Sequence, residues 1–259
     1  MPRRIDRCEW KDSPDMTQIE VSDPLTLATF AAPGLRAVRR FWRAFVLIQA
    51  CALMLVLTYF HSAAVQHACE TLSRWHENGG LLLSAIAAAI AGGIVPEIAK
   101  AVVPPKSLPI ENGGKKRGHL LSRGDLCFAI ITFAINGIIT DLQYRMFNRL
   151  IGSDHSFLTA LKKMLTDQFI TTPLYGAVYW AAVYRWKALG FRLMPLLREV
   201  GPQWYLRNVG RLIVTSWCFW IPMVLMVYLM PQDLQFSLFC IVLAAWSLLM
   251  VFVANDPQT

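Results

Sequence analysis

The chain has 259 residues, of which 55% are hydrophobic and only 16% are charged, and its mean hydropathy is +0.42. Soluble domains have roughly 45–50% apolar and about 25% charged residues, so this composition excludes an ordinary soluble protein. The formal net charge is +8. The basic residues lie between apolar blocks and form no single basic face, which argues against nucleic-acid binding.

Residues 1–40 form the one long polar stretch of the chain. Acidic and basic side chains are interleaved there, a mixture that is unlike a signal peptide or an acid-poor transit peptide. We expect a polar N-terminal tail that ends in a short amphipathic helix at about residues 24–40. The remainder, residues 41–254, is expected to be a transmembrane helical bundle.

Six apolar blocks follow the tail, each about 20 residues long, which is the length that a helix needs to cross a bilayer. They cover approximately residues 41–60, 81–103, 125–147, 168–186, 211–231 and 234–254. The blocks predict an all-α polytopic bundle with about six spans. Because the turn at residues 231–233 is so short, the last two spans are expected to form an antiparallel hairpin.

The connecting segments differ in basic residues. With six crossings, the tail, the second and fourth loops and the C-terminal end carry 18 Lys and Arg, and the segments on the other side carry four. The positive-inside rule then places both termini on the cytoplasmic or matrix side. A bacterial inner membrane and an organellar membrane both fit this arrangement.

Small residues are concentrated in the second block, where residues 85–93 read Ala-Ile-Ala-Ala-Ala-Ile-Ala-Gly-Gly. Such a run lets a neighbouring helix backbone approach closely in a membrane. We therefore expect the second helix to be central in the bundle.

Sequence signatures of enzymes and metal sites are lacking. The chain contains no HExxH, GxSxG, P-loop or dinucleotide-binding pattern, and its six cysteines form no CxxC pair. We expect no enzymatic activity, no cofactor, no zinc site and no disulfide framework. The cysteines are expected to be small buried apolar residues, and the histidines, His76 among them, to be solvated.

Ionisable side chains interrupt the apolar blocks, and each costs roughly 2.5–3.5 kcal/mol to insert into a bilayer. In the second block, Pro96 precedes Glu97 and Lys100, which share one helix face. They predict either the lining of a water-filled vestibule or a helix end at the interface. In the third block, Asp141 and Arg145 have i, i+4 spacing. They predict either a structural ion pair between helices or the lining of a conduction path.

The fourth block begins with Asp167 and Gln168 and contains Pro173. This pattern predicts either a helix N-terminal cap with a proline kink or a polar pore lining. Three prolines, Pro96, Pro173 and Pro222, are candidate helix bends that could gate a path.

The segment 160–173 reads Ala-Leu-Lys-Lys-Met-Leu-Thr-Asp-Gln-Phe-Ile-Thr-Thr-Pro. Its Lys163, Asp167, Gln168 and Pro173 resemble, in identity and spacing, the signature of the Mpv-seventeen and peroxisomal-membrane-protein-twenty-two family. The resemblance covers residues 80–253.

The last two apolar blocks also resemble this family, through a set of aromatic residues and a proline turn: Trp217, Trp220, Tyr228, Pro231 and Trp246. The chain departs from the family at Gln235, where an arginine is usual.

The resemblance implies a compact helical bundle in a mitochondrial inner, peroxisomal or similar membrane. It also implies a weakly selective channel or a small-solute carrier. The alternative is a non-conducting scaffold or assembly factor in which the same polar residues form buried pairs. The expected partners are the lipid bilayer, with anionic lipids or small metabolites as further candidates, and an oligomer is compatible with the sequence.

Overall fold

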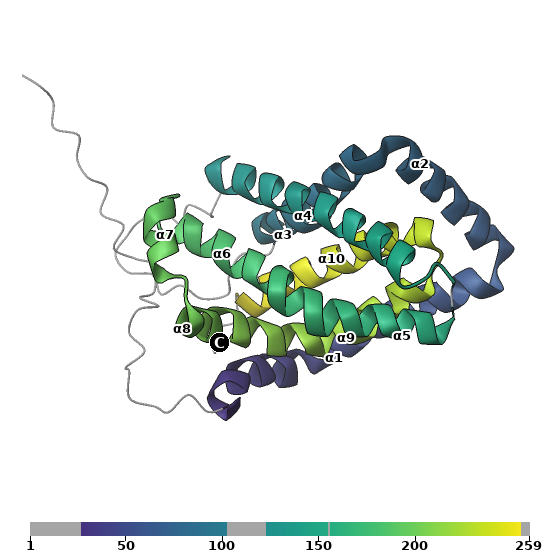
Figure 1. Ribbon diagram of the computed structural model, residues 1–259. Helices are drawn as coiled ribbons and strands as arrows, with labels where there is room; N and C mark the ends of the chain where they lie inside the picture. Colours follow the sequence, from purple (N-terminus) through teal and green to yellow (C-terminus); the bar gives the residue numbers. More distant parts are fainter. Residues whose placement is uncertain (1–26, 103–122, 155, 255–259) are drawn as a thin grey trace, which may run out of the picture.

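A computed structural model describes residues 27–102, 123–154 and 156–254 (Figure 1), and every regular element in these ranges is helical. This confirms the all-α prediction. The long N-terminal elements are α1 (Leu27–His61), α2 (Ala63–Ala88), the π-helical segment η1 (Ala89–Ile94), α3 (Val95–Val102) and α4 (Arg123–Leu150). The remaining elements are α5 (Phe157–Thr166), the π-helical segment η2 (Asp167–Gly176), α6 (Ala177–Ala188), α7 (Leu193–Glu199), α8 (Pro202–Trp204), the π-helical segment η3 (Tyr205–Gly210), α9 (Arg211–Leu229) and α10 (Gln232–Ala254).

Four helical stretches are long and apolar enough to cross a membrane: Arg39–His61, Ala63–Ala99, Arg123–Leu150 and Gln232–Leu249. The first of these has only 11% of its most apolar window buried inside the protein. Such an outward-facing apolar helix is expected where the surroundings are lipid. The coarse prediction of an integral membrane protein is therefore supported by helix length and composition.

The connection between the first two predicted spans differs from the expected loop. α2 already begins at Ala63, and it bends within the helix at Gly80, whose φ of 51° is left-handed. Ser73 and His76 on this first part of α2 are buried, and α2 packs against α10. The segment is helical because these side chains have a packing partner that is distant in sequence.

α10 lies in the middle of the bundle, where it contacts α1, α2, η1, α3, α4 and α9 (Figure 1). Its inward side chains, including Phe236, Phe239 and Leu243, belong to the main apolar core. The central position expected for the second helix is therefore taken largely by the last one, while α2 and η1 pack on both α10 and α4.

Glycines permit the close packing of the second helix on α4. A Cβ added at Gly137 would lie 2.5 Å from Ala88 Cβ and 2.5 Å from the backbone oxygen of Ser84. A Cβ at Gly93 would lie 3.3 Å from the backbone of Ala129. The small-residue run thus meets another helix backbone at close range, as expected from the sequence.

We predict that Gly137→Ala lowers the free energy of unfolding in detergent by about 1–3 kcal/mol, because the new methyl group overpacks a backbone contact. The measurement is thermal unfolding followed by intrinsic fluorescence. Gly176→Ala is the matched control, since its Cβ would find the nearest atoms of Thr172 at 4.0 Å. Equal effects of the two substitutions would contradict the close-packing argument.

Candidate functional site

A first group of polar side chains lies between α2 and α4, and we call it the Asp141 cluster: His76, Ser84, Asp141 and Arg145. Arg145 donates two hydrogen bonds to the Asp141 carboxylate, from Nε to Oδ1 at 3.1 Å and from Nη2 to Oδ2 at 3.0 Å. The Ser84 hydroxyl donates to Asp141 Oδ2 at 2.7 Å. The i, i+4 pair that the sequence singled out is therefore joined to a second helix.

His76 completes this cluster from the other side of the bend in α2. Its Nε2 lies 2.9 Å from the Ser84 hydroxyl oxygen and 3.5 Å from Asp141 Oδ2. Its ring stacks on Phe236 of α10, with centroids 5.0 Å apart and planes 6° apart. The sequence expectation of a solvated His76 was wrong, because the folded α2 directs this side chain into the bundle, where only 7% of it is exposed.

Side-chain exposure differs sharply within the Asp141 cluster. The Asp141 side chain is 3% exposed, whereas the Arg145 side chain is 48% exposed. The carboxylate is therefore held inside, while its cationic partner reaches the protein surface. A buried carboxylate with three hydrogen-bond donors is well compensated.

A second group of polar side chains, the Asp167 cluster, joins α4, α5, η2, α9 and α10: Gln143, Asn148, Lys163, Asp167, Tyr228 and Gln235. Gln143 Nε2 donates to Asp167 Oδ1 at 2.9 Å, and the Tyr228 hydroxyl donates to Asp167 Oδ2 at 3.0 Å. Tyr228 is fully buried and packs edge to face on Tyr144 at 5.4 Å.

Lys163 lies over the Tyr228 ring, with Nζ 5.8 Å from the ring centroid. Only 1% of Lys163 is exposed, and its ammonium group donates to Asn148 Oδ1. Asn148 Nδ2 donates to Gln235 Oε1 at 3.3 Å, and Gln235 Nε2 donates to the Met230 carbonyl at 3.1 Å. A continuous chain of polar contacts therefore links α5 to the start of α10.

The π-helical segment η2 begins at the two residues of the Asp-Gln motif. Gln168 is 3% exposed, and its carbonyl oxygen accepts from Trp217 Nε1 of α9 at 2.9 Å. Its side-chain Oε1 is buried and has no hydrogen-bond partner among the described residues. Pro173 lies inside η2, and its carbonyl oxygen accepts from the Tyr205 hydroxyl at 3.0 Å. The backbone irregularity thus coincides with the predicted bend.

The other predicted site residues lie apart from these clusters. Pro96 and Glu97 lie at the start of α3, directly after η1, and Glu97 is 8% exposed. Lys100 lies in the same helix, and its side chain is outside the described set. α9 continues through Pro222 without an interruption, so this proline is not at a break.

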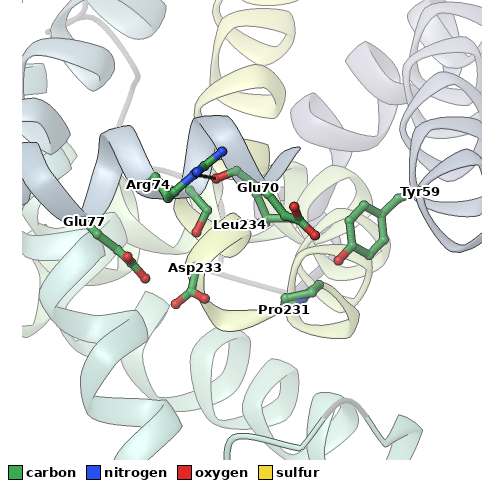
Figure 2. A pocket seen from close by; sticks show the side chains of 8 residues that line it. Tyr59, Glu70, Arg74, Glu77, Pro231, Asp233 and Leu234 are labelled. Atoms are coloured by element: carbon green, nitrogen blue, oxygen red, sulfur yellow. Dashed lines mark hydrogen bonds between the residues drawn. The ribbon is translucent and has the colours of Figure 1, made fainter. Parts of the chain in front are cut away.

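The remaining residues of the family resemblance cluster around the α9–α10 connection and the aromatic core. Trp220 and Trp246 have ring centroids 6.0 Å apart. Pro231 lines a surface pocket of about 350 Å³, where α1, α2 and the start of α10 meet (Figure 2). Glu70, Glu77, Asp233 and Arg74 give this pocket mixed charge.

Sequence reasoning missed the residues that complete the two clusters, namely His76, Ser84, Gln143, Asn148 and Gln235. Each is uncharged or weakly basic, so none interrupts an apolar block as an obvious acid or base does. Ser84 is adjacent to the small-residue run, and Gln235 was marked as a departure from the family. Neither observation indicates which distant residue Ser84 or Gln235 is hydrogen-bonded to.

The described cysteines differ from the expectation that they are buried. Cys51, Cys127 and Cys218 are exposed, whereas Cys69 and Cys240 are partly buried. Cys8 lies outside the described residues. Among the residues that the structure describes, no group of three or more His, Cys, Asp or Glu side chains is arranged to hold a metal ion.

Comparison of the chain with protein-family models, with curated proteins and with solved structures finds no match.

We predict that Tyr228→Phe lowers the free energy of unfolding by about 1–3 kcal/mol, because it removes a donor from the buried Asp167 carboxyl group. Tyr144→Phe is the matched control. Tyr144 is equally buried and lies against the same ring, yet no hydrogen bond from its hydroxyl to a described residue is found. Thermal unfolding in detergent measures the stability of both variants. An equal loss of stability in the two variants would show that the hydrogen bond from Tyr228 to Asp167 is not the cause.

A double-mutant cycle tests the ion pair of the Asp141 cluster. We expect Asp141→Asn and Arg145→Gln to be coupled by about 1–3 kcal/mol, because either single change leaves the other group without its charged partner. The control cycle uses Asp125→Asn and Lys187→Gln, a pair 2.6 Å apart in which Asp125 is exposed and Lys187 is partly exposed. Its coupling should be smaller, about 0.2–1 kcal/mol. Additive losses at Asp141 and Arg145 would refute the pairing.

Proposed function

We propose that this protein crosses the membrane six times and acts as a channel or carrier for small solutes. Two further crossings would join the four apolar stretches: one through α5, η2 and α6, and one through α9. The alternation of helix ends along the bundle in Figure 1 supports this topology. It would pair α9 and α10 as a hairpin and bring both termini to one side, the cytoplasmic or matrix side of a bacterial inner or organellar membrane.

The observation that carries the transport proposal is the change from α-helix to π-helix at Asp167 and Gln168. π-Helical turns within α-helices are rare, and they are frequent at functional sites. The buried Oε1 of Gln168 has no partner among the described residues. An unsatisfied buried acceptor is able to bind water or a polar solute.

Membership of the Mpv-seventeen and peroxisomal-membrane-protein-twenty-two family is part of the same proposal. Lys163 and Asp167, two residues of the shared motif, belong to one buried cluster around Tyr228. The arginine that the family usually carries after the turn would lie at Gln235, which here bonds to Asn148. The polar interior would therefore differ from that of the family at this point.

A second candidate function, a non-conducting scaffold, is favoured by a different observation. The Asp141 carboxylate is saturated by Ser84 and Arg145, with His76 close by. Such a pairing fixes the register of α2 on α4 and needs no solute.

Planar-bilayer recording of the purified full-length protein in potassium chloride gradients, together with swelling of proteoliposomes in neutral solutes, separates the two functions. For a channel or carrier, we expect Asp167→Asn to change the current or the swelling rate by about tenfold, the change that about 1.4 kcal/mol produces. Asp125→Asn is the control, because Asp125 is an exposed aspartate that pairs with Lys187 and lies outside both clusters.

The absence of both current and swelling, from protein that shows a cooperative unfolding transition, would overturn the transport proposal and favour the scaffold. Equal transport by the parent and by Asp167→Asn would retain transport but remove Asp167 from the path.

A further inference from the structure

The chain between α6 and α8 exposes large apolar side chains outside the four candidate spans. Phe191, Leu193, Met194, Leu197 and Val200 are between 51% and 66% exposed. They lie at the end of the bundle where α4 begins and α6 ends (Figure 1). Five such side chains within ten residues form an apolar patch of the kind that marks an interaction surface.

α7 is one-sided. Leu193 and Leu197 have i, i+4 spacing and share its outer face with Met194, whereas Leu196 is 7% exposed and points inward. No described part of the protein covers the outer face. α7 therefore presents an uncovered apolar face at the end of the bundle.

A tight turn fixes this element to α6. The Phe191 N–H donates to the Trp186 carbonyl at 2.9 Å and the Gly190 N–H donates to the Lys187 carbonyl at 3.0 Å, the two bonds of a Schellman motif. The Phe191 and Trp186 rings pack edge to face at 5.2 Å. Phe191 has a φ of 62°, which is costly for an aromatic residue. The turn is thus held in one conformation despite its strain.

An ion pair closes the other end of the element. Arg185 donates to both carboxylate oxygens of Glu199, at 2.7 and 2.8 Å. These hydrogen bonds lower the pKa of the Glu199 carboxyl, so it stays ionised and its charge is compensated. Arg192 and Arg198 are exposed, and no ion pair between either of them and a described residue is found. The exposed face is therefore apolar with a net positive rim.

We propose that residues 186–200 form an interfacial anchor, which lies in the headgroup layer of the membrane and binds anionic phospholipid. Arg192 and Arg198 contact the lipid phosphates, and Leu193, Met194 and Leu197 enter the boundary with the acyl chains. Apolar side chains beside exposed basic residues are the two signals that hold a segment at an anionic interface. Trp186 lies at the base of the anchor, where indole rings prefer the headgroup region. This proposal does not depend on whether the protein conducts.

The position of the anchor is tested with an environment-sensitive nitrobenzoxadiazole label on Leu197→Cys, in a full-length chain whose six native cysteines are replaced by alanine. The protein is reconstituted into vesicles of phosphatidylcholine and phosphatidylglycerol. We expect blue-shifted emission that headgroup-level nitroxide lipids quench. Ser153→Cys, exposed in the turn between α4 and α5, is the control and should give water-like emission.

Water-like emission from position 197 would overturn the proposal. Shielding that appears only when the number of protein copies per vesicle rises would identify a second copy as the occupant and would overturn it as well.

The choice of lipid is tested with the double variant Arg192→Gln and Arg198→Gln. In detergent micelles, added phosphatidylglycerol should raise the melting temperature of the parent, and the double variant should need about thirtyfold more lipid for half of that rise, the factor expected for two basic contacts. Arg74→Gln with Arg149→Gln is the control, because both arginines are exposed near the opposite end of the bundle. Equal lipid requirements of the two double variants would refute anionic lipid binding by the anchor.

Discussion

The approach of α2 to α4 at Gly137 is the contact on which the interior of this bundle depends. Gly137 lies one turn before Asp141, and the backbone of Ser84 lies against it at a distance that leaves no room for a side chain. The Ser84 hydroxyl reaches the Asp141 carboxylate from this same crossing. In a membrane, helices gain little from the hydrophobic effect when they associate, so close packing and interhelical hydrogen bonds supply the attraction. Gly137 permits both the close packing of the two helices and the hydrogen bond between them.

α4 extends this constraint to the rest of the molecule. Asp141 and Arg145 belong to the cluster on α2, whereas Gln143 and Asn148 bond to Asp167, Lys163 and Gln235. Rotation of α4 about its axis would therefore break both sets of hydrogen bonds together. α10 contacts the same assembly through Phe236 and Gln235, which explains why the last helix and not the second occupies the middle.

The sequence predicted the helical class, the apolar stretches and the position of the acids within them, because hydrophobicity and helix spacing are local properties. It predicted the i, i+4 pair of Asp141 and Arg145 for the same reason. It could not predict that His76 is buried, since this depends on the bend at Gly80 and on Phe236, which lies 160 residues further along the chain. Tyr228 was noted as part of a resemblance, yet its bond to Asp167 spans 61 residues and follows only from the packing of α9 on α5.

The Asp141 cluster and the segment η2 differ in the buried polar groups that they leave without a hydrogen bond, and this difference bears on function. A scaffold requires its buried polar groups to be paired at all times, and the Asp141 cluster meets that requirement. A carrier or channel would require polar groups that a solute can use, and the candidates for such groups lie along η2, where the buried oxygens of Gln168 and Tyr175 find no partner among the described residues. The bundle therefore has one half that is held by α2 and α4, and another half in which the helix changes from α to π at Asp167. Solute binding would be expected in the second half, because unpaired acceptors in an apolar interior are stabilised by any donor that reaches them.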